Sequence, residues 1–88
     1  MNKYAIIISW EYRDTDRDPE DAIIYCESLK DAESQMHQIE KDLWLIKENG
    51  RVKHTVETIS KIEHEWENGV KFIASIERLD NQVQKCII

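Results

Sequence analysis

The stretch KIEHEWENGVKFIASI, residues 61–76, decides the fold, because two alternating apolar segments flank the turn formers Asn68 and Gly69. Alternating apolar and polar residues are typical of a strand that buries one face. A three-residue loop with Gly69 in the left-handed conformation is favoured over a two-residue Asn-Gly turn, which would place Trp66 opposite Lys71. The predicted cross-strand pairs are Trp66–Val70, His64–Phe72, Ile62–Ala74 and Glu65–Lys71. The sequence therefore predicts an antiparallel hairpin with one apolar face.

The same alternation begins earlier in the chain, at Arg51, and continues to Trp66. One strand of about 15 residues would extend about 50 Å, which exceeds the size of a small domain, so we predict a bend or break near residues 59–60. The alternative is a helix that ends at Gly69 and has one apolar side, formed by Val56, Ile59, Ile62 and Trp66. We prefer the strand because β-branched residues dominate the segment.

An apolar stripe with helical spacing precedes this region. Its members recur at intervals of three and four residues and are Leu29, Ala32, Met36, Ile39, Leu43 and Ile46. Ser28 and Asp31 have the spacing of a capping box, and Asn49-Gly50 is a typical helix stop. We therefore predict one long amphipathic helix over about Leu29–Glu48.

The N-terminal part of the chain predicts two strands, residues 3–10 and 22–27, with Ala5 and Ile6 on opposite apolar faces of the first. Between them, EYRDTDRDPED carries six acidic residues and two arginines, and its Pro19 favours a turn. The C-terminal residues Val83, Cys86, Ile87 and Ile88 predict a short strand or a packed tail. The predicted fold is α+β: a small antiparallel sheet with the helix packed on one face, in the order ββαββ, optionally followed by a short final strand.

Length and charge narrow the class of protein. The chain has 88 residues, with 18 Asp and Glu against 12 Lys and Arg, and a formal net charge of −6. A chain of this length builds one core, so we expect residues 1–88 to form a single domain. The excess of acidic over basic residues argues against direct nucleic-acid binding. No apolar segment approaches the roughly 20 residues of a membrane-spanning helix, and none resembles a secretory leader. Two widely separated cysteines, Cys26 and Cys86, indicate a reducing cytoplasm.

No motif of catalysis or metal binding is complete. Asp14, Asp16 and Asp18 have the alternation of a calcium loop, but Pro19 stands where that loop needs Gly, and Tyr25 where it needs Glu. Nor do the histidines and cysteines have the short spacing of a zinc site; His54 and His64 would share a strand face, ten residues apart. We therefore predict no catalytic residues, no metal and no cofactor, with Cys26 as an inert core residue.

These features predict a non-enzymatic protein-interaction module. Thirteen Ile against four Leu are typical of AT-rich coding DNA and suggest a phage or mobile-element accessory protein. Such a protein could inhibit a host nucleic-acid-handling enzyme, of CRISPR or restriction type, in the host cytoplasm. Its partner would be a host protein with a basic nucleic-acid-binding surface. The predicted partner-binding residues are Glu11, Asp14, Asp16, Asp18, Glu20, Asp21, Trp44, Glu63, Glu65 and Glu67. The alternatives are a small-molecule or metal-ion-binding domain and a self-assembling homodimer with no inhibitory role.

Overall fold

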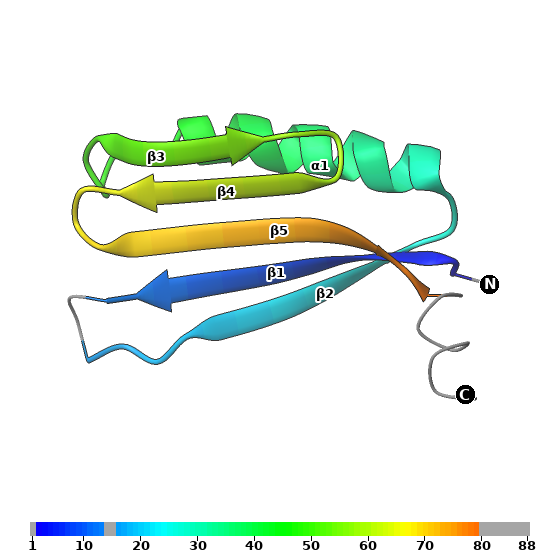
Figure 1. Ribbon diagram of the computed structural model, residues 1–88, viewed down its shortest axis with the longest axis horizontal. Coiled ribbons are helices and arrows are strands. Elements are labelled where there is room, and N and C mark those ends of the chain that lie inside the picture. The colour runs from blue at the N-terminus through cyan, green and yellow to red at the C-terminus, as the bar shows by residue number, and fades with distance from the viewer. Residues whose placement is uncertain (1, 14–15, 80–88) are drawn as a thin grey trace.

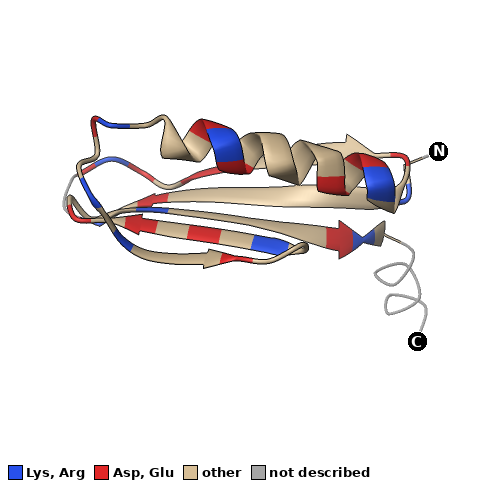
Figure 2. Cartoon of the chain, turned by 90° about the horizontal axis from the view of Figure 1, so that it is seen from above, with Lys and Arg blue, Asp and Glu red and all other residues tan. Residues whose placement is uncertain are grey.

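The computed structural model describes residues 2–13 and 16–79, which form a sheet and one helix in two layers (Figure 1; Figure 2). The elements are β1 (Tyr4–Tyr12), β2 (Glu20–Cys26), α1 (Leu29–Trp44), β3 (Val52–Glu57), β4 (Lys61–Trp66) and β5 (Val70–Arg78). Across the sheet the strand order is β2-β1-β5-β4-β3, and all neighbouring strands are antiparallel. The predicted α+β class, with one helix on one face of a small antiparallel sheet, is confirmed.

Strand β1 occupies an interior position between β2 and β5, as its two apolar faces predict. Ala5 and Ile6 point to opposite faces, and both are fully buried. The predicted hairpin of the first two strands is also present. Both strands extend further than predicted, to Tyr12 and from Glu20, so the acidic connection between them is shorter.

Helix α1 begins where the capping pattern predicts. The Ser28 hydroxyl accepts a hydrogen bond from the backbone N–H of Asp31 at 3.1 Å, which satisfies one of the free donors of the first turn. The helix face toward the sheet is formed by the predicted stripe, in which Ala32, Met36 and Leu43 are buried. These three residues are the helix's contribution to the buried core cluster, whereas Leu29 at the start of the stripe is exposed.

The predicted C-terminal end of the helix, Glu48, is wrong, because α1 ends at Trp44. The backbone N–H groups of Leu45 and Ile46 bond to carbonyl groups three residues earlier, at 3.1 and 3.2 Å. Bonds of this spacing tighten the last turn and take the chain off the helical path. Half-buried Ile46 then packs against the core, a tertiary contact that overrides the stop signal further along the chain.

The break predicted near residues 59–60 is confirmed, since β3 ends at Glu57 and β4 begins at Lys61. Thr58 closes the turn: its N–H donates to the Lys61 carbonyl at 2.8 Å, and its hydroxyl accepts from the Lys61 N–H at 3.0 Å. The predicted long strand therefore folds back on itself as two paired strands, and the order becomes ββαβββ.

The β4–β5 hairpin follows the predicted three-residue loop, with Gly69 at a φ of 89°. The observed pairs include Ile62–Ala74, His64–Phe72 and Glu65–Lys71. One detail of the side chains differs. Lys71 forms its ion pair with the diagonal neighbour Glu63, at 2.9 Å, and Glu65 instead lies 3.4 Å from Arg13. The diagonal contact is within the reach of a long lysine side chain.

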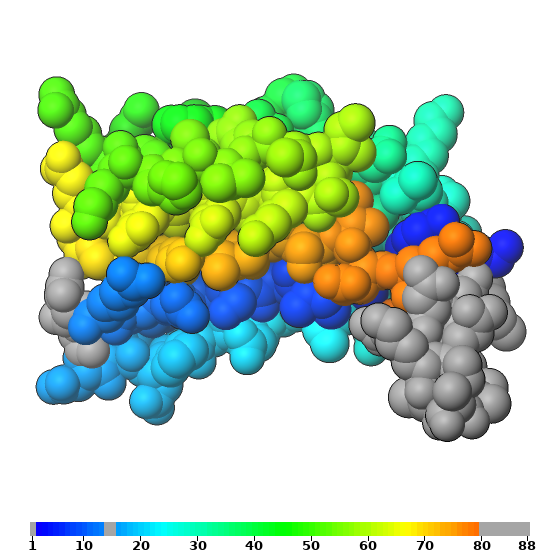
Figure 3. All heavy atoms as spheres, in the orientation of Figure 1, coloured from blue at the N-terminus to red at the C-terminus, as the bar shows by residue number. Residues whose placement is uncertain are grey.

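The expectation that His54 and His64 share a strand face is wrong. A register shift between Val52 and His54 marks a bulge, after which His54 lies opposite Glu65 and Thr55 opposite His64. His64 consequently points toward α1 and is fully buried, whereas His54 is exposed on the other face of the sheet. This second face, which α1 does not cover, is the one seen in Figure 3.

Aromatic rings dominate the core between α1 and the sheet. Trp10 stacks on Trp66 with ring centroids 5.9 Å apart and meets the edge of Phe72 at 4.8 Å. Cys26 is buried in this core, as predicted, and desolvation together with nearby Asp31 raises the pKa of its thiol. The predicted C-terminal strand or tail lies outside the described residues. No helix of the described chain has both the length and the apolarity required to cross a membrane.

Candidate functional site

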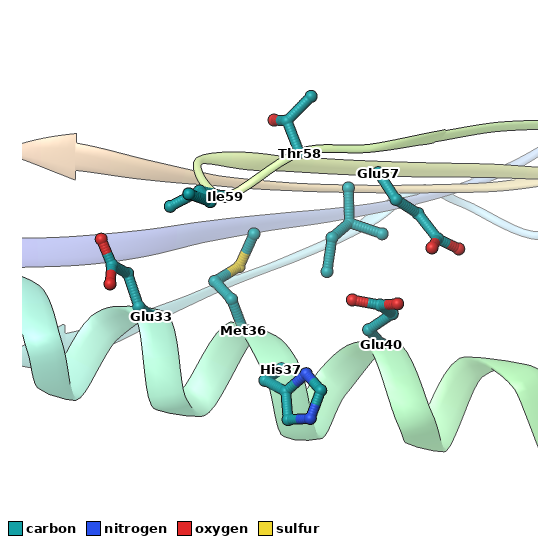
Figure 4. A pocket seen from close by; sticks show the side chains of 8 residues that line it. Glu33, Met36, His37, Glu40, Glu57, Thr58 and Ile59 are labelled. Carbon is teal, nitrogen blue, oxygen red and sulfur yellow. The ribbon is translucent and has the colours of Figure 1, made fainter.

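Two grooves flank α1 on the helix-bearing side of the molecule. The first, here called the glutamate groove, opens between α1 and the β3–β4 turn and has a volume of about 440 Å³ (Figure 4). It is lined by Glu33, Met36, His37, Glu40, Glu57, Thr58, Ile59 and Ile62. The second, here called the edge groove, opens between α1 and the β1–β2 hairpin and has a volume of about 380 Å³. It is lined by Ile8, Trp10, Glu20, Asp21, Ala22, Ile39, Asp42, Leu43, Ile46 and Phe72.

One carboxylate oxygen organises the interior side of the glutamate groove. Oε1 of Glu57 accepts hydrogen bonds from Nε1 of Trp44 at 3.0 Å and from Oγ1 of Thr55 at 3.3 Å, and it lies 3.1 Å from Nε2 of His64. The ring of Trp44 also meets the ring of His64 at 4.7 Å, edge to face. These contacts hold the end of β3 against the last turn of α1.

Glu40 and Glu57 face each other across the groove, one from the helix and one from the sheet (Figure 4). A hydrogen bond between the two carboxyl groups, followed by desolvation, raises the pKa of Glu40. Burial acts to raise the pKa of Glu57 too, but hydrogen bonds from His64, Glu40 and Trp44 outweigh it, and the pKa of Glu57 is lowered. Glu40 is therefore the carboxyl group of the pair that takes up the shared proton first.

His64 is the one buried polar residue of the described core. Its Nε2 faces Glu57, whereas its Nδ1 has no hydrogen-bond partner among the described residues. The Nε2–H tautomer suits this arrangement, because the donor then points at the carboxylate and no N–H is left buried without an acceptor. His64 thus supports the position of Glu57 and does not reach the groove itself.

The electrostatic character of the two grooves is the same. Each is lined by three carboxylates, and among the residues that the structure describes neither lining includes Lys or Arg. Glu20 is the exception within this set, because it forms an exposed ion pair with Arg17 at 2.9 Å. Figure 2 shows acidic residues of α1 near both ends of the helix, each group beside a lysine. The two groove linings therefore carry an excess of negative charge, although Lys30 and Lys41 lie on α1 itself.

On the opposite face of the sheet, two acidic residues have basic partners. Glu63 is neutralised by Lys71, and Glu65 by Arg13. The hydrogen bond from Lys71, opposed by desolvation, lowers the pKa of Glu63. Acidic residues therefore lie on both faces of the sheet. Glu63 and Glu65 have basic partners, whereas the described linings of the two grooves contain no lysine or arginine.

The residues predicted to bind a partner do not form one surface. Glu20 and Asp21 line the edge groove, and Trp44, with 44% of its surface exposed, lies at the helix end beside Glu57. Glu11, Glu63 and Glu65 lie on strands at the face away from α1, Glu67 is in the β4–β5 turn, and Asp16 and Asp18 are exposed in the β1–β2 connection. Asp14 lies outside the described residues.

Four groove carboxylates are missing from the predicted partner-binding residues: Glu33, Glu40, Asp42 and Glu57. A signal for two of them exists, because Glu33, His37 and Glu40 recur at intervals of four and three and so lie along one side of a helix. The role of Glu57 had no such signal. Its meeting with the helix depends on the β3–β4 break and on the strand order.

Metal ligation finds no support in the described part of the chain, where no three His, Cys, Asp or Glu side chains converge on one point. Comparison with known proteins finds no matching family model, no similar curated protein and no similar solved structure. The function is therefore argued from the grooves alone.

Proposed function

We propose that the protein is a non-enzymatic interaction protein that binds a basic region of a partner protein on its helix-bearing side. The observation that carries the proposal is the lining of the two grooves beside α1, with three carboxylates each and no lysine or arginine. An uncompensated acidic surface attracts cationic groups and accelerates their association.

The geometry of the grooves suits lysine and arginine side chains. Both grooves are open and large enough for the end of a long side chain, and exposed ion pairs of this kind contribute about 0.2–1 kcal/mol each. The exposed ring of Trp44 lies at the end of the helix between them and offers a surface on which a guanidinium group can stack. Several modest contacts together would provide a specific site.

The proposed partner class is a protein whose basic groove otherwise binds nucleic-acid phosphates. Such grooves concentrate arginine and lysine, which are absent from the two described groove linings of this protein. A chain with net charge −6 that occupies such a groove competes with nucleic acid and inhibits the partner. A host nuclease of CRISPR or restriction type, encountered by a phage or mobile-element protein in the host cytoplasm, is the example that this reasoning favours.

The test compares two variants with matched loss of charge. Glu33→Gln/Asp42→Asn removes one carboxylate from each groove, and Glu63→Gln/Glu65→Gln removes two from the opposite face. Partners captured by the tagged protein are eluted in a salt gradient and identified, and each purified partner is then tested for competition with DNA or RNA. We expect the groove variant to elute at lower salt and to compete about twofold to thirtyfold less well, because two ion pairs of about 0.2–1 kcal/mol each are lost.

The control variant should behave like the wild type, provided that circular dichroism shows both variants to be folded. Binding that does not depend on salt would contradict the proposal. So would equal weakening by the two variants, because the site would then not be on the helix-bearing side.

A further inference from the structure

We propose that β2 is the strand to which the partner adds its own strand. The occupant is an extended segment of the partner that alternates apolar residues with lysine or arginine and pairs with the outer edge of β2. This inference rests on the proposed function for the sign of the partner's charge, and on the sheet itself for the mode of binding.

No described strand pairs with the outer edge of β2. Among the described strands, β2 has β1 as its only neighbour, and the two are joined by seven consecutive pairs, from Tyr4–Cys26 to Trp10–Glu20, without a register shift. In such an edge strand every second residue directs its N–H and C=O away from the sheet. These groups form a regular template for one more strand.

The opposite edge of the sheet, β3, is constructed differently. Its register with β4 shifts between Val52 and His54, and a bulge of this kind twists an edge away from further pairing. Lys53 lies at the bulge and Arg51 precedes the strand, so this edge also carries positive charge. An added basic strand is therefore directed to β2 and not to β3.

Apolar surface is present on both sides of the β2 edge. On the helix side, the edge groove has a mainly apolar floor to which Ile39 and Ile46 contribute. On the other side, Ile23 and Tyr25 are 53% and 57% exposed. Because side chains of a strand alternate between its two faces, the apolar residues of an added alternating strand would all contact one of these surfaces, and its lysine or arginine residues would lie on the other face.

The charge around β2 selects a basic partner over a second copy of this chain. Residues 20–27 contain Glu20, Asp21 and Glu27 and no lysine or arginine, and Asp42 lies across the edge groove. Pairing of two β2 strands would bring two such acidic segments together, which is unfavourable between neighbouring strands. A strand that carries lysine or arginine gains attraction from the same residues.

The experiment uses the 88-residue chain and a synthetic peptide of about nine residues in which valine alternates with lysine. Titration of the ¹⁵N-labelled protein is followed by NMR together with amide hydrogen exchange. We expect saturable binding below about 1 mM, and exchange of the outward-facing β2 amides slowed at least about tenfold. The matched control is the same peptide with alternate amides N-methylated, which keeps charge and side chains but removes donors from one edge. It should bind at least about tenfold more weakly.

Each outcome decides one point. Equal binding of the N-methylated peptide, or protection confined to β3, overturns strand addition while leaving the binding of basic partners intact. Failure of the valine–lysine peptide at about 1 mM overturns strand addition as well, and the groove variants above then decide the proposed function separately. A dimer in light scattering, with contacts between two β2 strands, overturns the choice of occupant. Glu20→Gln/Asp21→Asn should weaken peptide binding about threefold to tenfold if the acidic end of β2 selects the charge.

Discussion

Substitution of His64 tests how the polar group in the core is accommodated. The residue is fully buried, its Nε2 lies 3.1 Å from Glu57, and its Nδ1 has no partner among the described residues. Its ring contacts those of Trp44 at 4.7 Å and Trp66 at 5.5 Å. His64→Phe keeps most of the ring volume and these contacts, whereas His64→Ala removes the ring.

The two substitutions should differ strongly in free energy of unfolding. Loss of a hydrogen bond to a charged group costs about 1.5–3 kcal/mol, and removal of a buried unsatisfied nitrogen recovers about 1–3 kcal/mol. These terms oppose each other, so we expect His64→Phe to remain within about 1.5 kcal/mol of the wild type. His64→Ala adds the cavity of an aromatic ring, for which about 3–5 kcal/mol is typical. The whole chain, at usual values per residue, has only about 4–13 kcal/mol.

Urea unfolding followed by tryptophan fluorescence measures the difference, because Trp66 is buried in the folded protein. With a slope of about 1 kcal/mol per molar urea, the cavity cost of about 3–5 kcal/mol should separate the midpoints of the two variants by about 3–5 M. His54→Ala, at the exposed histidine, is the control and should change stability by less than about 0.5 kcal/mol. Equal destabilisation by Phe and Ala would refute the reasoning, since the bond to Glu57 would then outweigh ring packing.

Three further substitutions test the site and the turn. Glu40→Gln should raise the thermal midpoint at neutral pH by about 1–4 °C, because the raised pKa of Glu40 makes the wild type lose stability as the pH rises through that pKa. Calorimetry below pH 4.5, the ordinary glutamate value, should find no gain in thermal midpoint for the variant. Glu63→Gln should instead destabilise the protein, because the Lys71 hydrogen bond lowers the pKa of Glu63. The free energy of unfolding should fall by up to about 1 kcal/mol at neutral pH. Urea titrations should show this loss disappear as the pH falls through the lowered pKa. Gly69→Ala should cost about 1–2 kcal/mol in the same assay, because Gly69 has a φ of 89°, and Gly69→Asn should cost less.

The candidate site was only partly predictable from the sequence. Glu20, Asp21 and Trp44 were identified from charge and residue type, and two of them line the edge groove. The sequence could not show that Glu63 and Glu65 are neutralised, because the base that meets Glu65 is Arg13, 52 positions away. It also could not show that Glu57 meets Glu40, since that contact joins two elements whose relative placement depends on the strand order.

Local physical chemistry determined the elements themselves. The alternation of residues 61–76 and the left-handed Gly69 predicted the register of the β4–β5 hairpin, and Ser28 predicted the first residue of α1. These features depend on neighbours within a few positions, so a residue pattern suffices to predict them. The excessive length of the alternating segment also predicted its break at the β3–β4 turn.

Only the tertiary structure decided where the helix ends, which face His64 occupies and which acids remain uncompensated. Packing of Ile46 on the core ended α1 early, and the bulge in β3 placed His54 and His64 on opposite faces. The open edge at β2 follows from the order β2-β1-β5-β4-β3, in which the last described strand inserts beside the first. Such pairings bring together residues far apart in sequence, and their energy depends on packing and charge across the sheet, which no local pattern contains.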